Sequence, residues 1–251
     1  MHLRRSKATQ ITVKQGTQVP CFYFYFTAST NYLAKAFVTE NNLTTPLVVV
    51  AKEQSQGRGR YDRTFLSPKG GVYMTYVAPA GDDFLCWSLY ASVAVTRALS
   101  RLGVDKDRIS VKWPNDVNLD GKKVCGILPE SIVKGDRFVL LGIGVNLNTK
   151  SKCLAPVKDV ATSVYEATGK RHSIMKVASS IVKELYSLTN SEDKGTILAE
   201  YKSCLETIGK SVMRADGMSG VAVDVTCDGA LVVECDGQTK EISWGEVCYV
   251  K

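Results

Sequence analysis

The sequence predicts an α+β protein in which a helix-flanked β-sheet is followed by a small all-β module. Two observations carry this prediction. Short apolar segments of strand length alternate with segments of helical periodicity over residues 20–206. From Ser211 onward, short alternating strands are separated by Asp-Gly turns at 216–217, 228–229 and 236–237.

The composition is that of an ordinary globular protein. The chain has 251 residues, of which 45% are hydrophobic and 23% charged. That balance excludes a disordered, collagenous or low-complexity protein, and the length allows one large or two small domains. No apolar run approaches the roughly 20 residues that cross a bilayer, so we expect no membrane anchor.

The net charge of +7 is concentrated in two segments. Residues 1–20 contribute +4 and residues 52–70 contribute +3, while the remaining residues are neutral in sum. A surface for duplex nucleic acid would need a wider distribution of basic residues. We expect residues 1–20 to form a loose basic arm; an organellar targeting segment is the less favoured alternative because the arm lacks an apolar helical face.

The cysteines indicate a reducing compartment. There are eight, none in a C-x-x-C pair, and the chain has only His2 and His172. Clustered zinc ligands are therefore not visible, and a catalytic Cys–His pair is disfavoured. With no hydrophobic secretion signal, we expect reduced, mostly buried cysteines and a cytoplasmic protein.

Each predicted strand and helix is inferred from the local pattern of apolar, turn and capping residues. Residues 20–27 are apolar and aromatic, residues 84–102 are apolar at helical spacing before Gly103, and Asp120-Gly121 marks a hairpin turn. The expected strands are 20–27, 47–51, 72–78, 117–119, 124–128, 137–147, 211–215, 220–227, 230–235 and 239–243. The expected helices are 30–41 (capped by Ser29 or Thr30), 84–102, 160–168, 173–189 and 193–206.

Residues 54–71 form a polar loop that carries the second charge cluster. Its glycines let backbone N–H groups approach an anion, and its arginines offer permanently charged forks for a carboxylate or phosphate. A loop of this kind can close over a compact ligand and exclude water. An RNA-binding Arg-Gly segment or a plain solvated loop remains an equal alternative on composition alone.

A second group of polar residues surrounds the predicted 117–128 hairpin. Asp116 stands where one strand begins and Lys123 opens the next, so the hairpin can bring carboxylate and ammonium to one rim. Glycines at 126, 142 and 144 would leave one strand face open for a flat apolar ligand. Alternatively, Trp113 is core, the lysines are solvated and the glycines permit helix packing.

Four motifs in this order resemble those of biotin protein ligases. They are Gln54…Gly57-Arg58-Gly59-Arg60…Arg63…Ser67-Pro68…Gly70-Gly71, Lys112-Trp113-Pro114-Asn115-Asp116, Lys123-x-x-Gly126-Ile127-Leu128-x-Glu130 and Gly142-Ile143-Gly144-Val145-Asn146. Any one motif is weak, whereas the four together are highly specific. The resemblance covers about residues 20–150, and the terminal β module resembles the SH3-like cap of that family.

This resemblance implies the fold in more detail. A catalytic domain at 21–206 would have a mixed central β-sheet flanked by helices, as in class II synthetases. A small SH3-like β-barrel module would follow at 207–251.

It also implies an activity. Such enzymes activate biotin with ATP and Mg²⁺ to biotinyl-5′-AMP, and then biotinylate one lysine of a carboxyl-carrier domain of a carboxylase. Mg²⁺ accompanies ATP and no residue is assigned to a metal. The resemblance is compatible with a homodimer.

Roles for individual residues follow from the same resemblance. The implied biotin-binding positions are Ser29, Thr30, Asn31, Gln54, Gly126, Leu128, Gly142 and Gly144. The implied ATP and adenylate positions are Arg58, Gly59, Arg60, Arg63, Lys112, Asn115, Lys123 and Asn146, the last at the adenine edge. The implied catalytic residues are Lys123, Arg60 and Asp116. Lys123 and Arg60 would stabilise charge on the reacting oxygens, and Asp116 would either orient groups or accept a proton.

Three positions depart from the family pattern. Asp62 stands where glycine is usual, Phe65 where tryptophan is usual, and Pro129 replaces an aliphatic residue. We expect the first two to affect closure of the loop. Pro129 would interrupt edge pairing of its strand because it lacks an N–H.

Two other functions are weighed against this one. A lipoate protein ligase shares the fold, but the Gly-Arg-Gly-Arg loop and the Lys-Trp-Pro-Asn-Asp run favour biotin. A ligase that is also a repressor needs a helix-turn-helix, and about twenty residues before the first expected strand are too few for one. We therefore expect no sequence-specific DNA binding.

Overall fold

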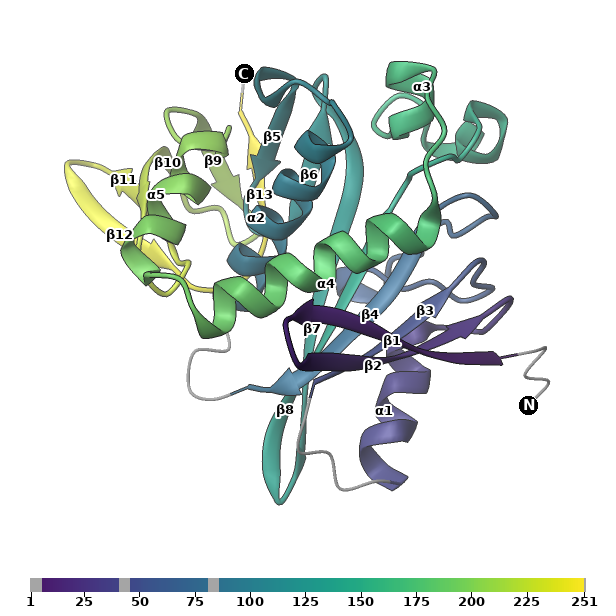
Figure 1. Cartoon of the computed structure of the whole chain (residues 1–251). Helices are drawn as coiled ribbons and strands as arrows, with labels where there is room; N and C mark the ends of the chain where they lie inside the picture. The colour runs from purple at the N-terminus through teal and green to yellow at the C-terminus, as the bar shows by residue number, and fades with distance from the viewer. Residues whose placement is uncertain (1–5, 41–45, 81–85, 251) are drawn as a thin grey trace.

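A computed structural model describes residues 6–40, 46–80 and 86–250, and Figure 1 shows the chain. An eight-stranded sheet is followed by a five-stranded sheet, which confirms the predicted fold class. The strands of the first sheet are β1 (Ser6–Lys14), β2 (Thr17–Phe24), β3 (Leu47–Ala51), β4 (Val72–Pro79), β5 (Ile109–Lys112), β6 (Asp116–Leu119), β7 (Lys122–Lys134) and β8 (Asp136–Val145). The α-helices are α1 (Thr30–Glu40), α2 (Cys86–Arg101), α3 (Val164–Thr168), α4 (Ile174–Asn190) and α5 (Lys194–Cys204).

The first sheet is mixed. Its order is β1-β2-β3-β4-β8-β7-β6-β5, and β2 pairs with β3 in parallel whereas the other neighbours are antiparallel. β3 is buried along its whole length and β4 in all but its last residue. Their continuous apolar sequences reflect this position, since helices cover both sheet faces.

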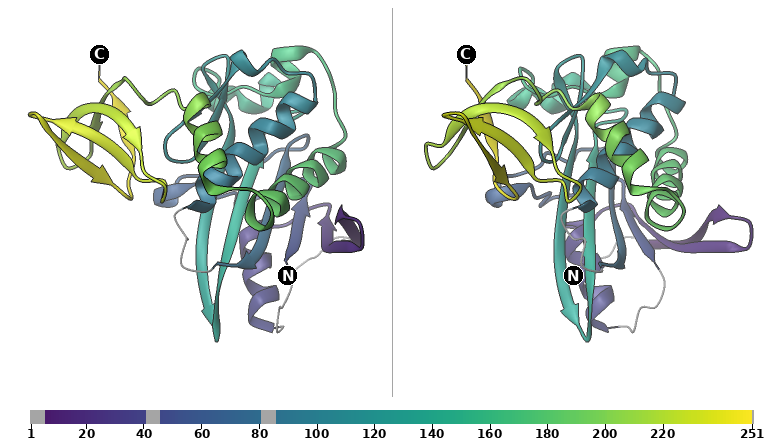
Figure 2. Two further views of the ribbon diagram at one scale, coloured as in Figure 1. Left: turned by 60° about the vertical axis from the view of Figure 1, so that its left-hand side comes forward. Right: turned by 90° about the vertical axis from the view of Figure 1, so that its left-hand side faces the viewer.

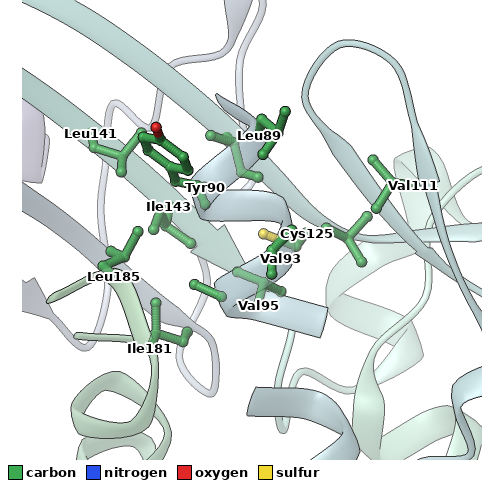
Figure 3. Close-up of a cluster of buried hydrophobic side chains, with 14 of the residues drawn as sticks. Leu89, Tyr90, Val93, Val95, Val111, Cys125, Leu141, Ile143, Ile181 and Leu185 are labelled. Atoms are coloured by element: carbon green, nitrogen blue, oxygen red, sulfur yellow. The ribbon is translucent and has the colours of Figure 1, made fainter. Parts of the chain in front are cut away.

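Two apolar cores lie on opposite faces of the sheet. The larger one packs α2 and α4 against β4, β7 and β8, and Figure 3 shows Tyr90, Val93, Ile143, Ile181 and Leu185 converging there. The smaller one packs α1 against β3, β4 and β8 through Leu33, Ala34 and Val38. The start of α1 is thereby held against the middle of the sheet.

The expectation of a loose arm at residues 1–20 is wrong for residues 6–20. β1 and β2 form an antiparallel hairpin whose turn contains Gly16 at φ +77°, and the hairpin occupies one end of the sheet. Ile11 is buried in the larger core, and Lys14 Nζ lies 5.6 Å from the Tyr186 ring centroid. The alternation of apolar residues, and not the net positive charge, therefore decides that this segment forms a strand. Arg4 and Arg5 lie outside the described residues.

The expectation that Pro129 interrupts strand pairing is also wrong. β7 pairs with β8 without a break from Cys125↔Val145 to Lys134↔Asp136. The N–H of Ile127 points away from β8, since it donates to Asn115 O. Two residues later, the nitrogen of Pro129 faces the same side, beyond the end of β6, where no ladder bond is lost.

Several element boundaries differ from the predictions. Of the expected helix 160–168, only Val164–Thr168 is α-helical, starting at the Ser163 cap and ending before Gly169 at φ +70°. A 3₁₀ helix at Ser151–Val157, the strand β5 and the extension of β7 to Lys134 were not predicted. Asn41 and residues 84–85, which belong to predicted helices, lie outside the described residues.

The second sheet packs beside the first through a shared core. Its order is β12-β11-β10-β9-β13, entirely antiparallel, and Figure 2 shows it at one end of the molecule. Trp113 Nε1 donates to Gly229 O at 3.0 Å, and Lys202 Nζ pairs with Asp224 Oδ1 at 2.6 Å. Its strands are β9 (Ser211–Arg214), β10 (Ser219–Val225), β11 (Leu231–Cys235), β12 (Gln238–Ile242) and β13 (Val247–Tyr249), of which β13 was not predicted.

Candidate active site

A cavity of about 230 Å³ lies against β7 and β8, with the loop of residues 54–71 and the start of α1 in its wall. Residues 246–247, from the second sheet, complete the lining. All the predicted site residues except Asn146 line it: Ser29, Thr30, Asn31, Gln54, Arg58, Gly59, Arg60, Arg63, Lys112, Asn115, Asp116, Lys123, Gly126, Leu128, Gly142 and Gly144. Positions spread over 116 residues of sequence therefore meet at one place.

The β6–β7 hairpin brings Lys123 and Asp116 together, as expected from the sequence. Lys123 Nζ lies 2.6 Å from Asp116 Oδ1, and both side chains are partly buried. The backbone of Lys123 is fixed by two bonds to residues 160–162, because its N–H donates to Val160 O and its carbonyl accepts from Thr162. The ion pair and the anchored backbone thus fix the Lys123 ammonium at the cavity wall.

Uncharged polar groups from α1 and from residues 54–71 form part of the cavity lining. Gln54 Oε1 accepts from the backbone N–H of Thr30 at 2.8 Å, and Gln54 Nε2 donates to Ser67 Oγ at 2.9 Å. These two hydrogen-bond partners therefore determine the orientation of the Gln54 side-chain amide. Ser29, Thr30 and Asn31 are all buried at the first turn of α1.

The loop of residues 54–71 supplies the positive charge of the cavity. Arg58 pairs with Asp62 at 2.9 Å, and Arg63 pairs with Glu246, which raises the pKa of Arg63 above its usual value. Tyr61 and Asp62 adopt left-handed conformations with φ of 53° and 54°. Asp62 tolerates this conformation better than most residues, which explains how it can replace the family's usual glycine.

The three glycines of β7 and β8 face the cavity, but other side chains occupy the space that they leave. A Cβ on Gly144 would lie 2.5 Å from the Phe65 ring, and one on Gly126 would lie 3.0 Å from it. A Cβ on Gly142 would lie 2.6 Å from Asn31 Oδ1. The open strand face is thus partly covered by the loop and by α1.

The remaining predicted residues lie at the edges of the site. Lys112 Nζ lies 4.6 Å from the Tyr249 ring centroid, and Asn115 Nδ2 donates to Ile127 O at 2.7 Å. Asn146 is buried outside the cavity lining, and its Nδ2 donates to Thr162 O. Its Oδ1 is buried and has no hydrogen-bond partner among the described residues.

Three residues of the site, Thr75, Glu130 and Glu246, were given no role from the sequence, and Phe65 was expected only to affect closure of the loop. Thr75 and Glu130 hydrogen-bond to Asn31, Phe65 covers the glycines, and Glu246 pairs with the arginine loop. The sequence could have pointed to Thr75, because a hydroxyl residue inside the apolar strand β4 is unusual. Nothing in the sequence pointed to Glu246, since only the packing of the second sheet brings it to the cavity.

Metal clusters and membrane-spanning helices are both absent from the described residues. Among residues 6–40, 46–80 and 86–250, no group of three or more His, Cys, Asp or Glu side chains is placed to hold a metal ion. No helix within those same ranges combines the length and the hydropathy needed to cross a bilayer.

Comparison with known proteins agrees with this geometry. The profile of the Biotin/lipoate A/B protein ligase family matches residues 23–148, which is half of the chain. The Bifunctional ligase/repressor BirA of Bacillus subtilis is 30% identical over 220 residues, covering 82% of this chain and 66% of that protein. The Biotin–[acetyl-CoA-carboxylase] ligase of Mycobacterium tuberculosis is 28% identical over 217 residues, covering 82% and 79%. The chain thus spans slightly less than two thirds of the Bacillus protein.

Among solved structures, a biotin protein ligase from Aquifex aeolicus in complex with biotin and ATP superposes with a TM-score of 0.77 at 27% identity. The match covers 92% of this chain and 98% of that one, so it includes both sheets. It supports the predicted pairing of a catalytic domain with a small terminal β module. The family profile, the relatives and the shared architecture show that this chain belongs to the biotin protein ligases of the biotin/lipoate A/B protein ligase family.

Proposed function

We propose that this chain is an ATP-dependent biotin protein ligase. In the first step a carboxylate oxygen of biotin attacks the α-phosphorus of ATP, and pyrophosphate leaves. In the second step the amine of an acceptor lysine attacks the acyl carbon of biotinyl-5′-AMP, AMP leaves, and the amine loses a proton. The printed names of the relatives, among them a biotin–[acetyl-CoA-carboxylase] ligase, support this reaction.

The observation that carries the proposal is the polarity of the cavity. Its lining combines hydroxyl and amide groups without formal charge with the cationic groups of Arg58, Arg60, Arg63 and Lys123. Biotin has the same two halves, a neutral ureido head and a carboxylate tail. Polar head groups that enter a dry site must find hydrogen-bond partners, since each unpaired buried group costs about 1–3 kcal/mol.

The cationic groups account for the first step. Carboxylate and phosphate oxygens repel each other, so their approach requires charge that is already positioned. Lys123 is held in place by Asp116, and the arginines sit on a loop whose ends are anchored at β3 and β4. The ion pair favours an orienting role for Asp116 over proton acceptance, because protonating its carboxylate would break the pair.

Magnesium enters this proposal with ATP. Mg²⁺ prefers octahedral oxygen ligands and usually keeps several waters beside substrate phosphates, so it needs no cage of protein carboxylates. The acceptor that we propose is a biotin carboxyl-carrier domain of a biotin-dependent carboxylase. A cytoplasmic location, a homodimer and the absence of sequence-specific DNA binding stay predictions.

Biotin-dependent pyrophosphate release tests the proposal, followed by mass-spectrometric detection of biotin on a carrier domain. Lys123→Ala and Arg60→Ala should each slow adenylate formation by at least about 10²-fold, the usual effect of losing one stabilising donor. Lys122→Ala is the matched control, because Lys122 is exposed and lies outside the cavity lining. Normal rates in both active-site variants would reject the assignment. Binding of lipoate and not of biotin would transfer the chain to the sister activity.

A further inference from the structure

A second cavity, of about 210 Å³, lies where the second sheet packs beside α2 and β7. Hydrogen bonds tie its two sides together: Trp113 Nε1 donates to Gly229 O at 3.0 Å, and Cys86 Sγ, at the start of α2, donates to Cys227 O at 3.5 Å. Trp244, which follows β12, lines the cavity and is 69% exposed. The cavity is therefore held between packed elements and reaches solvent at Trp244.

This second cavity adjoins the active-site cavity. Arg60, Leu128 and residues 113–115 line both. In the proposed function, Arg60 stabilises charge on the reacting carboxylate and phosphate oxygens. The second cavity therefore ends beside the atoms that react when the biotinyl group is transferred.

The lining of the second cavity carries one cation and no carboxylate. Among residues 6–40, 46–80 and 86–250, its ionisable members are Arg60 and Tyr201. Burial raises the pKa of the Tyr201 phenol, so this group is uncharged at neutral pH. Leu89 and Pro129 contribute apolar surface, and Ser88 contributes an uncharged hydroxyl.

Such surroundings favour a neutral amine over an ammonium ion. A free lysine amine has a pKa of about 10.4, so about one in 2,500 is neutral at pH 7 and able to attack an acyl carbon. Loss of water in an apolar cavity and the like charge of Arg60 both lower that pKa. Asp116 and Glu246 line the adjoining cavity, but each is already paired with a basic side chain.

We propose that the second cavity is the entry channel for the acceptor lysine and delivers its amine in the neutral form. The inference rests on the proposed function and adds the route of the acceptor to it. Apolar walls suit the methylene stem of a lysine, and the exposed Trp244 ring offers a contact to the chain around it. The amine nitrogen bonds to the acyl carbon, the bond from that carbon to the phosphate oxygen breaks with its electron pair on AMP, and a proton of the amine leaves to solvent.

The first test alters the charge of the channel. Adenylate is formed from biotin and ATP, a carrier domain is added, and single-turnover transfer is followed from pH 7 to pH 10. Ser88→Asp places a carboxylate in the first turn of α2, where a helix tolerates an acid well. A rise of about one unit in the amine pKa should make transfer about tenfold slower at pH 7 than in Ser88→Asn, which has nearly the same size. The two variants should become equal near pH 10, because the amine is then neutral in both. A difference that persists at pH 10 would instead indicate capture of Arg60 and would reject the channel.

The second test obstructs the channel. Ser88→Phe should slow transfer to the carrier at least about tenfold, the loss expected when a cavity for one side chain is filled. Hydroxylamine, a small amine that is mostly neutral at pH 7, should still react with the bound adenylate at the wild-type rate. Equal losses with the two nucleophiles would show damage to the active site and would contradict the proposal.

Trp244→Ala tests the opening of the channel. It should raise KM for the carrier at least about fivefold and leave biotin-dependent pyrophosphate release unchanged, because only the acceptor contacts Trp244. Val223→Ala, an exposed change on β10 outside the cavity lining, is the control. An unchanged KM for the carrier in Trp244→Ala would overturn the assignment of this opening.

The outcomes distinguish this inference from the proposed function. Wild-type protein that releases no pyrophosphate with biotin and ATP overturns both. Wild-type protein that forms the adenylate, with transfer unaltered in Ser88→Asp and in Ser88→Phe, overturns the channel alone. Because Trp244 is exposed, Trp244→Ala decides the matter if Ser88→Phe does not fold.

Discussion

The Arg63 guanidinium donates to the carboxylate of Glu246, a residue 183 positions later in the chain. This ion pair joins the loop of residues 54–71 to the residue that precedes β13, and both side chains line the cavity. The Arg63 side chain is 60% exposed and that of Glu246 is 35% exposed. An exposed pair of this kind contributes less than about 1 kcal/mol to overall stability. We therefore expect the ion pair to restrain the loop of residues 54–71 and to contribute little to the stability of the whole fold.

Glu246→Gln should loosen the loop without unfolding the protein. Loss of about 0.5–1 kcal/mol of local stabilisation corresponds to a two- to fivefold rise in the open population. Trypsin cleavage after Arg58, Arg60 and Arg63 should accelerate by that factor, and high salt should remove the difference from wild type. Glu241→Gln, an exposed change on β12, is the control. Equal cleavage rates in the two variants would show that the pair does not restrain the loop.

Gly142→Ala should weaken biotin binding selectively. The new methyl group would lie 2.6 Å from Asn31 Oδ1 and displace that amide from its bonds to Thr75 and Glu130. Overpacking of this kind costs about 1–3 kcal/mol, so Kd for biotin should rise about five- to 150-fold. Kd for ATP should stay within about threefold of wild type.

Titration calorimetry with each ligand alone measures both values for Gly142→Ala. Gly195→Ala, on an exposed turn of α5, is the matched control and should change neither. An equal loss of biotin and ATP affinity in Gly142→Ala would indicate a general disturbance of the sheet instead.

Arg97→Met should destabilise the fold strongly. Arg97 on α2 donates to three carboxylates, at 2.6 Å to Glu200, 2.8 Å to Glu192 and 3.2 Å to the buried Glu184. Removing the guanidinium leaves Glu192 and Glu200 without this partner beside Glu184, which still pairs with Arg101. The group is partly exposed, so we expect a cost of about 2 kcal/mol, below that of a fully buried pair. Urea unfolding at pH 7 measures the loss, and Arg137→Met, an exposed change on β8, is the control.

The effect of Arg97→Met should depend on pH. The hydrogen bond from Arg97 holds the pKa of Glu192 below its usual value. A lowered carboxyl pKa contributes stability above the unfolded-state pKa of about 4.3, and this is lost as the pH falls through the lower folded-state value. The difference between wild type and Arg97→Met should therefore shrink below about pH 4. A constant difference from pH 7 to pH 3 would contradict the electrostatic cause.

Thiol reactivity should divide the cysteines by burial. None of the eight, all of which lie among the described residues, forms a disulfide, and Cys227 and Cys248 are exposed. Burial raises the pKa of Cys21 and of Cys204 to about 11, so about one in a thousand of these thiols is ionised at pH 8. Ellman's reagent at pH 8 should modify two thiols rapidly and all eight only in denaturant. Raised thiol pKa values stabilise the fold below about pH 8.5, and this contribution is lost as the pH rises toward 11.

The prediction from sequence succeeded where local pattern and structure coincide. β3 and β4 are continuous apolar runs, α4 begins at its Ser173 cap, and the β6–β7 hairpin follows Asp120-Gly121. It failed where the decisive contact is distant. Residues 6–14 look like a basic tail until β2 is available as a pairing partner, and β5 is a strand because β6 lies beside it.

The sequence by itself determined which residues gather at the cavity only through its four motifs, whose resemblance to biotin protein ligases implied those positions. Turn chemistry predicted one contact, that between Asp116 and Lys123. Only the tertiary structure decided how these residues are oriented and which others join them. The turn of the Asn31 amide depends on Thr75 and Glu130, and the restraint on Arg63 depends on Glu246. Hydrogen bonds and ion pairs between strands and helices that are far apart in the sequence form only when the chain has packed. For that reason they cannot be predicted from the spacing of residues along the chain.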